Sequence, residues 1–372
     1  MRIVRASVTP IRLALAAPLE TARGAVRARE GAVLSLSAAS GATGWGEALP
    51  LPGFGLESAR EANRALERVA AGLVGSEPAD LDAALDAAAP LAQRAKSARA
   101  AADAALHDLA ARDAGVDTAS LLGPKRRERV AVSALVSGDD ANAAGANARR
   151  AVECGFRTLK LKLLAGELAR DEERVAAVRD SAGAGVKLRL DANGGWKEAT
   201  AFEAVERLAR FDIELLEQPL AAADVAALGR VRAASPIPIA ADEAVCDEDA
   251  AARLLDAGAA DLFVVKPAAL GGLRAAGRIA RSARRAGVGV VVTSFLDSSL
   301  GIATALHFAA SLPDSPFAAG LATAELLRDD LAPPFIVENG AITLPRACGL
   351  GIAPDALALR RCATGAPREF RA

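Results

Sequence analysis

Short apolar runs alternate with amphipathic stretches along the middle of the chain, from Val130 to about Ala324. The runs are rich in branched residues, which is typical of strands, and the stretches between them repeat apolar residues at helical spacing. The runs cover residues 130–136, 158–164, 186–192, 213–219, 237–243, 261–267, 288–295 and 316–322. Eight strands joined by crossover helices predict a parallel (β/α)8 barrel, with functional groups at the carboxyl ends of its strands.

A different pattern precedes this repeat. Residues 1–13 and 31–38 read as strands, and residues 41–53 have the glycine and proline content of a turn and loop. Alanine-rich helical patterns follow over residues 58–73 and 80–122, with breaks near Gly75, Pro78 and Pro90.

These patterns predict three segments along the chain. Residues 1–125 form an α+β capping domain, and the charged linker 123–129 leads into a catalytic barrel, residues 126–324. Residues 325–372 are too few to fold alone, so we expect them to return and complete the capping domain.

Ionisable residues stand at the ends of successive runs in the barrel region. They are the pair Lys160 and Lys162, then Asp191, Glu217, Asp242 and Lys266. The later ones follow one another at intervals of about 25 residues, the length of one strand, loop and helix. Residues at the same phase of successive units face the same mouth of a barrel, so we expect these side chains to converge on one site.

Composition narrows the class of protein. A net charge of −1, without long runs of like charge, offers nothing to attract a nucleic acid or an anionic membrane. The four cysteines are far apart, without a CxxC pair, and indicate reduced thiols. The first residues lack the apolar core of a signal peptide, and no window approaches the ~18 apolar residues of a membrane span. We expect a soluble, cytoplasmic protein, and the sequence leaves a homo-oligomer open.

Lysine is rare in this chain, with seven lysines among 45 basic residues. Lysine can lose its proton at an accessible cost, whereas arginine cannot. In a strand, residues i and i+2 share a face, so Lys160 and Lys162 both point into the barrel while Leu159 and Leu161 face the helices. Crowding two ammonium groups in a partly buried cavity is expected to lower the pKa of at least one and so provide a base. The alternative to a base is a half-exposed strand, in which both lysines lie on the face that is open to solvent.

Asp191, Glu217 and Asp242 offer hard oxygen ligands from three successive strands. Because no cysteine or histidine accompanies them, this set favours Mg2+, with Mn2+ as the expected substitute. Asn193 and Glu243 are the expected supporting partners. The alternative, that the carboxylates pair with arginines, is disfavoured by their common position in consecutive repeats.

Lys266 comes from the strand beyond Asp242, across the predicted lumen from Lys162. A cation between opposed lysines suits abstraction of a proton α to a carboxylate in a small-molecule substrate. The cation and one ammonium group stabilise the developing enediolate, and a neutral lysine takes the proton. The residues leave the later step open: reprotonation from the other face gives racemisation, and loss of a β-leaving group gives elimination.

The set KxK, DxN, EQP, DE and KP on successive strands resembles the enolase superfamily, in its muconate-lactonizing-enzyme-like branch. The resemblance extends over almost the whole chain, through GWGEA, ALHDLAARDAG, DANGGW, EQPL and KPAALGG. It implies a modified (β/α)8 barrel, of the (β/α)7β form, with an N-terminal α+β capping domain.

Within that branch, the segments PLETARGAVRAREG, GEALPLPGFGLES and TSFLDSSLGIATALHFAASLP, then GLATAELL, are most similar to the o-succinylbenzoate synthases of menaquinone biosynthesis. The resemblance implies a Mg2+-dependent lyase that removes an α-proton and then eliminates water. Lys162 would be the base and then the acid that assists departure of the β-hydroxyl. Lys266 would stabilise the enediolate.

The same resemblance implies which residues bind the substrate. Loops around residues 21–24 and 51–55 would close over it, and Ser294 would help to line the pocket. The implied substrate-binding residues are Ser294, Thr21, Arg23 and Phe54.

Other functions stay open at this point. Dipeptide epimerases of the branch usually carry an Asp-x-Asp on the eighth strand to hold the substrate ammonium, whereas residues 320–324 here are GLATA, with no acid before Glu325. This disfavours an α-amino substrate. N-succinylamino acid racemases share both lysines and the ligand set, and are the runner-up. A barrel used only for binding is disfavoured, because a decayed site would not keep every acid, base and ligand together.

Overall fold

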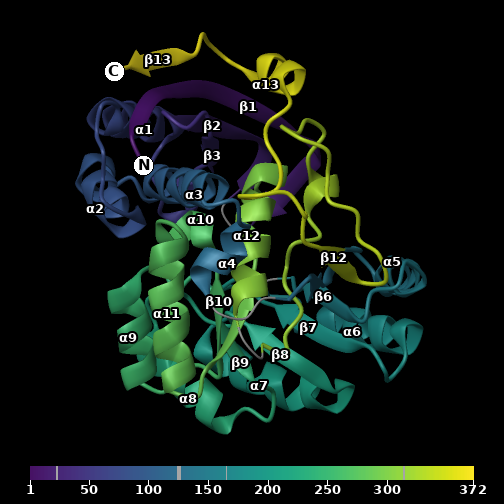
Figure 1. The fold of residues 1–372 in the computed structure, drawn as a ribbon. Helices are drawn as coiled ribbons and strands as arrows, with labels where there is room; N and C mark the ends of the chain where they lie inside the picture. The colour runs from purple at the N-terminus through teal and green to yellow at the C-terminus, as the bar shows by residue number, and fades with distance from the viewer. Residues whose placement is uncertain (22–23, 124–126, 165, 313–314) are drawn as a thin grey trace.

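The computed structural model describes residues 1–21, 24–123, 127–164, 166–312 and 315–372. A cap of sheet and helices lies against a barrel of parallel strands and helices (Figure 1). Both chain termini lie in the cap, so the chain leaves it once to build the barrel and then returns.

Within the described residues, the cap sheet has four antiparallel strands in the order β13-β1-β2-β3. The strands are β1 (Ile3–Thr21), β2 (Gly24–Ala38), β3 (Thr43–Ala48) and β13 (Arg368–Arg371). Alternate residues such as Val8, Leu34 and Leu36 are buried in the cap core, as the period of two predicts. The pairing of β13 with β1 confirms that the C-terminal segment completes the cap.

One face of this sheet is covered by the helices α1 (Ala59–Leu73), α2 (Leu81–Ala92) and α3 (Lys96–Asp113), which follow the 3-10 helix η1 (Pro52–Phe54). The short helix α4 (Thr118–Leu122) comes next and packs against α3 and against α12 (Ser299–Ser311) of the barrel. A capping box starts α1: Ser58 accepts from the Glu61 N–H, and the Glu61 carboxylate accepts from the Ser58 N–H. The break expected near Pro90 comes slightly later, since Pro90 lies inside α2 and the chain turns at Gln93, whose φ is 44°.

Seven parallel strands form the barrel sheet in the part of the chain that the structure describes, in the order β11-β10-β9-β8-β7-β6-β5. They are β5 (Ala134–Val136), β6 (Thr158–Lys162), β7 (Lys187–Asp191), β8 (Ile213–Glu217), β9 (Ile239–Ala241), β10 (Leu262–Val265) and β11 (Gly289–Val292). The segment expected as the eighth strand makes single bridges: Ala319 to Val132, and Gly320 to Thr293. It therefore links the two edges of the sheet, and the predicted fold class is confirmed.

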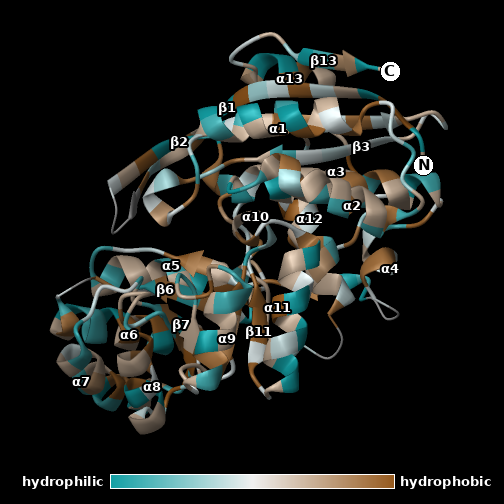
Figure 2. Ribbon diagram, turned by 90° about the vertical axis from the view of Figure 1, so that its left-hand side faces the viewer, coloured by the Kyte–Doolittle hydropathy of each residue, from teal (hydrophilic) through white to brown (hydrophobic). Residues whose placement is uncertain are grey.

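Helices alternate with the barrel strands. They are α5 (Ala141–Glu153), α6 (Leu168–Ala182), α7 (Glu198–Leu208), η2 (Ala209–Phe211), α8 (Val225–Ala234), α9 (Glu248–Asp256), α10 (Pro267–Leu270), α11 (Leu273–Arg285) and α12 (Ser299–Ser311). Figure 2 shows α10 and α12 at the junction between the cap and the barrel. The described helices include none that is both long and apolar enough to cross a membrane.

The last part of the chain touches both halves. It contains η3 (Ala324–Leu326), β12 (Ala341–Thr343) and α13 (Ala356–Cys362), and β12 pairs with β4 (Arg129–Ala131) at the start of the barrel. The domain boundaries at residues 125 and 324 stay a prediction.

Candidate active site

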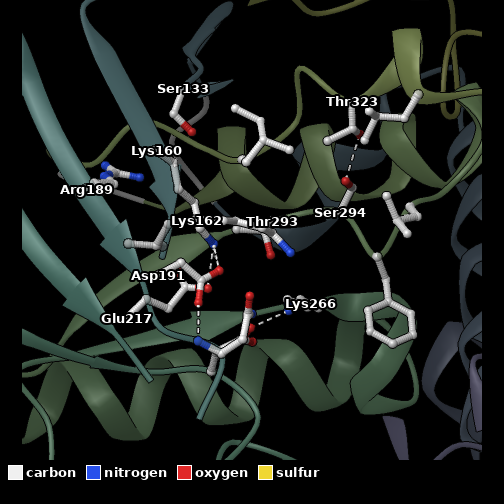
Figure 3. A pocket seen from close by; sticks show the side chains of 18 of the residues that line it. Ser133, Lys160, Lys162, Arg189, Asp191, Glu217, Lys266, Thr293, Ser294 and Thr323 are labelled. Atoms are coloured by element: carbon white, nitrogen blue, oxygen red, sulfur yellow. Dashed lines mark hydrogen bonds and ion pairs between the residues drawn. The ribbon is translucent and has the colours of Figure 1, made fainter. Parts of the chain in front are cut away.

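The ionisable residues of the repeat meet at one mouth of the barrel, because parallel strands end on the same side (Figure 3). They line a single cavity of about 150 Å³. Lys160 lies in the middle of β6 and Lys162 ends it, Asp191 ends β7, Glu217 ends β8, Asp242 follows β9 and Lys266 follows β10. The convergence predicted from their spacing is present in the structure.

Two lysines form ion pairs with the three carboxylates of this cluster. Lys160 Nζ lies 2.8 Å from Asp191 Oδ2 and 2.6 Å from Glu217 Oε1. Lys266 Nζ lies 2.6 Å from Asp242 Oδ2. The carboxylate residues are buried, so loss of one partner would leave an uncompensated charge away from water.

Burial and crowding shift the pKa values of these groups. Burial raises the pKa of Glu217 to about 8 against the attraction of Lys160, and Asp191 and Asp242 add to the rise. Burial would lower the pKa of Lys160 and of Lys266, but the surrounding carboxylates outweigh it and raise both. The pKa of Lys160 therefore does not fall through crowding, because Asp191 and Glu217 stabilise its charged form.

Lys162 lies in a different environment from Lys160. It lines the cavity, is half-buried, and makes no ion pair with any described residue. Leu159 and Leu161, which alternate with the two lysines, are fully buried in the barrel core, so the predicted division of this strand between lumen and helices is confirmed. Lys162 is therefore the lysine of the pair left available to a substrate.

The donor set of the site fits a hard divalent cation, because Asp191, Glu217 and Asp242 come from neighbouring strands and offer oxygen atoms alone. In their present orientation these oxygens face lysines. The described residues contain no group of three or more histidine, cysteine, aspartate or glutamate side chains positioned to hold a metal ion. The fit thus rests on ligand chemistry and shared location, and the assignment of ligands stays a prediction.

The two expected supporting residues lie beside the carboxylates. Asn193 acts through its backbone, whose N–H donates to Asp191 Oδ1 at 2.9 Å. Glu243 lines the cavity next to Asp242, and its Oε2 is buried without a hydrogen-bond partner among the described residues.

Gln218 is a supporting residue that the sequence analysis did not single out. It is fully buried, and its Oε1 accepts from the backbone N–H groups of Asp242, at 2.8 Å, and Ala244, at 3.2 Å. Gln218 thereby fixes the chain where Asp242 leaves its strand. The signal was present in the EQP motif, where this residue directly follows Glu217.

The outer wall of the cavity is apolar and comes from strands, 3-10 helices and loops of both the cap and the barrel. It is lined by Leu19, Leu51, Phe54, Leu135, Val291, Phe295, Leu296, Ala322 and Leu326. Ser294 and Thr323 add hydroxyl groups, with Oγ and Oγ1 2.9 Å apart. Among the described lining residues, carboxylates are confined to Asp191, Glu217, Asp242 and Glu243.

Two of the four predicted substrate-binding residues line the cavity. Phe54 and Ser294 line the cavity, and the Phe54 ring meets the Phe295 ring edge-on at 5.9 Å. Thr21 is the last residue of β1, but its side chain lies outside the described part of the chain, as does the whole of Arg23. Sequence reasoning missed Leu19, Leu296 and Leu326, since single leucines far apart in the sequence form no motif.

A capped parallel barrel, with lysines and carboxylates at successive strand ends, defines an enzyme of the enolase type. Two families match the chain: "Enolase C-terminal domain-like" over residues 143–358, and "Mandelate racemase / muconate lactonizing enzyme, N-terminal domain" over residues 3–123. The chain belongs to the enolase superfamily, in its muconate-lactonizing-enzyme-like branch.

Relatives in this superfamily differ in their reactions. The chain is 34% identical to the L-Ala-D/L-Glu epimerase of Bacillus subtilis, over 96% of this chain and 98% of the relative. It is 40% identical to the o-succinylbenzoate synthase of Mycobacterium bovis, over 67% of this chain and 72% of the relative. It also resembles the structure of the dipeptide epimerase from Cytophaga hutchinsonii complexed with Mg and D-Ala-L-Val, with a TM-score of 0.90 and 28% sequence identity. The match covers 99% of this chain and 100% of that chain.

Proposed function

We propose that this protein is an o-succinylbenzoate synthase: a Mg2+-dependent carbon–oxygen lyase that dehydrates a cyclohexadiene carboxylate, in the cytoplasm, for menaquinone biosynthesis. The observation that carries the proposal is the composition of the outer wall. Gly320, Ala322 and Thr323 line the cavity in the segment where an epimerase would hold the substrate ammonium, and none of them is acidic. A ring without an amino group suits such a wall.

Lys162 is assigned the proton transfers of this reaction. Its Nζ takes the α-proton as the α-C–H bond breaks, and the electron pair moves into the carboxylate to give an enediolate. The electrons then return as the C–O bond to the β-hydroxyl breaks, and Lys162 gives the proton to the departing oxygen. Water leaves, and the new double bond makes the ring aromatic.

Lys160 and Lys266 are assigned a supply of fixed charge, because each is already paired with carboxylates. Their ammonium groups hold Asp191, Glu217 and Asp242 in the cavity and stabilise charge that develops on the substrate carboxylate. Mg2+, held by these three carboxylates, would supply further positive charge beside that substrate carboxylate, and Mn2+ is expected to replace it. The similar dipeptide epimerase from Cytophaga hutchinsonii is complexed with Mg, which supports this choice of cation.

The second candidate is an N-succinylamino acid racemase. It is favoured by the presence of Lys162 and Lys266 in one cavity, since racemisation needs a proton donor and acceptor on opposite faces of the α-carbon. Similarity to an epimerase and to a synthase supports the proton abstraction that both reactions share, and the later step separates them.

Two incubations test the proposal with purified enzyme and Mg2+. The cyclohexadiene carboxylate should be converted to the aromatic product, followed by its ultraviolet absorbance. N-succinylamino acids in deuterated water should keep their α-hydrogen, read by NMR or mass spectrometry. Deuterium incorporation into both enantiomers of the N-succinylamino acid, without dehydration of the cyclohexadiene carboxylate, would reject the lyase and support the racemase.

A further inference from the structure

Arg29 is a buried cation that the reaction above does not use. It lies in β2 of the cap, is 0% exposed, and is not among the residues that line the cavity. Burial lowers its pKa to about 10, against the attraction of Asp297 and Glu47, so it is charged at neutral pH. A fully buried cation is retained only where it is well paired, so its partners indicate its role.

The guanidinium of Arg29 joins two loops that approach the cavity from different parts of the fold. On the cap side it donates to the carbonyl oxygen of Leu49 and, at 3.1 Å, to that of Pro50. On the barrel side it donates at 3.1 Å to the carbonyl oxygens of Phe295 and Leu296. The first loop continues directly into Leu51 and η1, and the second follows β11.

Both loops put side chains into the cavity. Leu51 and Phe54 come from the cap loop, and Phe295 and Leu296 come from the barrel loop. The Phe295 ring meets Phe54 edge-on, and its centroid lies 5.7 Å from Lys266 Nζ. A lysine ammonium at that distance is attracted by the ring face, so the position of Phe295 bears on the position of Lys266.

The barrel loop needs to be held in place. Leu296 has a φ of 57°, in the left-handed region that is unfavourable for a leucine. On one side Asp297 Oδ2 accepts from the Phe295 N–H at 2.8 Å, and on the other Arg29 donates to the Phe295 and Leu296 carbonyls. These bonds stabilise a conformation that the local sequence does not favour.

We propose that Arg29 is a positioning residue, which fastens the cap loop 49–54 to the barrel loop 294–297 and so holds Phe295 against Lys266. The inference rests on the proposed function only in taking Lys266 as a working group of the site. A planar guanidinium can serve carbonyls on two loops at once, whereas a lysine ammonium is a point charge on a flexible stem.

The test variant is Arg29→Lys, which keeps the charge. We expect kcat to fall by about 10- to 100-fold, because small misplacements around reacting groups have effects of that size, while KM changes by less than about threefold. Amide hydrogen exchange should become faster in segments 49–54 and 294–297, and not in β6 to β9.

Arg179 provides a matched control. It also donates to backbone carbonyls of separate segments, those of Phe211, Gly183, Val186 and Asp212, but these precede the barrel strands and lie away from the cavity. Arg179→Lys should leave kcat within about twofold of wild type, as for a substitution far from the site.

A second variant keeps the inference testable if Arg29→Lys does not fold. Phe295→Leu leaves the carbonyl acceptors of Arg29 in place but removes the ring from Lys266, and it should lower kcat by a similar factor. Where both single variants fold, the double variant should lose no more than either one, because the two changes act on the same contact.

In the kinetics, three results would overturn the inference: full kcat in a folded Arg29→Lys or in Phe295→Leu, a loss confined to KM, or an equal loss in Arg179→Lys. Hydrogen exchange needs no substrate. If wild-type enzyme does not dehydrate the cyclohexadiene carboxylate, the proposed function fails, while unchanged exchange in both loops of Arg29→Lys would reject the positioning role independently.

Discussion

The two sides of the cavity are built by different means. The charged side, from Lys160 to Lys266, stands at the ends of regular parallel strands, and its residues recur at a nearly constant interval. The apolar side is assembled from β1, the cap loop, β5, β11 with the loop that follows it, and residues 320–326, which lie far apart in the sequence. Under the proposed function, the charged side carries out the proton transfer and the apolar side contacts the rest of the substrate.

This difference suggests that reaction and specificity depend on separate parts of the fold. A change on the charged side should abolish proton abstraction for every substrate. A change on the apolar side should alter which substrate is accepted while leaving proton abstraction intact. The following predictions test that division, beginning with the largest expected effect.

Removal of Mg2+ should abolish the activity of the enzyme. Exhaustive treatment with EDTA should abolish turnover, and added Mg2+ or Mn2+ should restore it. Asp191→Asn, Glu217→Gln and Asp242→Asn should each weaken Mg2+ binding, measured by calorimetry, and excess Mg2+ should not restore the full rate, because the ligand geometry would still be wrong. Glu198→Gln, at the half-buried start of α7 and outside the cavity lining, is the control. Activity that survives chelation would remove the metal from the mechanism.

Lys162→Arg should lower turnover by at least ~10³-fold, since arginine keeps the charge but cannot act as a base. Steady-state kinetics would measure the loss, and circular dichroism should show an unchanged fold. Lys187→Arg is a matched control, because Lys187 begins the neighbouring strand, is exposed and pairs with Glu214. A variant that kept more than about a tenth of wild-type activity could not have lost the base.

Stability should fall as pH rises from 6 to 9, because of Glu47 at the cap–barrel junction. Burial raises the pKa of Glu47 to about 8, and repulsion from Asp297 and Asp330 adds to this, against hydrogen bonds from Ser298; Arg29 also lies nearby. With the folded pKa above the unfolded one, the stabilising contribution is complete below about pH 4.5 and is lost as pH passes through 8.

Through Glu47, the free energy of unfolding is expected to fall by about 2–3 kcal/mol between pH 6 and pH 9. Urea unfolding at a series of pH values measures it. Glu47→Gln should remove this share of the dependence and leave the share from Glu217, whose pKa burial also raises to about 8. Glu30→Gln, an exposed change on the neighbouring strand β2, should leave the whole dependence as in wild type. The same slope in Glu47→Gln and wild type would exclude Glu47 as its source.

Ala322→Asp should have the smallest effect and the most selective one. A carboxylate there would repel the substrate carboxylate by about 1–2 kcal/mol, so KM should rise roughly 10-fold with kcat little changed. Binding of an α-amino competitor, measured as inhibition, should improve at the same time. Equal losses of kcat in Ala322→Asp and Lys162→Arg would contradict the separation of the two sides.

Much of the fold and of the charged side could be predicted from the sequence. The interval between Asp191, Glu217 and Asp242 is the length of one βα unit, and such units put their strand ends at one mouth whatever the details of packing. The alternation of Lys160 and Lys162 with buried leucines follows from the geometry of any strand. These are local rules, and one sequence is enough to apply them.

Other features were decided by tertiary structure alone. That Lys160 is held charged by Asp191 and Glu217, while Lys162 is left without an ion pair in the described chain, depends on distances between strands. The apolar wall and the Arg29 contacts join segments separated by more than 200 residues, and nothing in their local sequence specifies the partner. The sequence by itself determined the chemistry at the strand ends, because backbone periodicity aims those side chains. Only the folded chain decided pairing and shape, because these depend on long-range contacts.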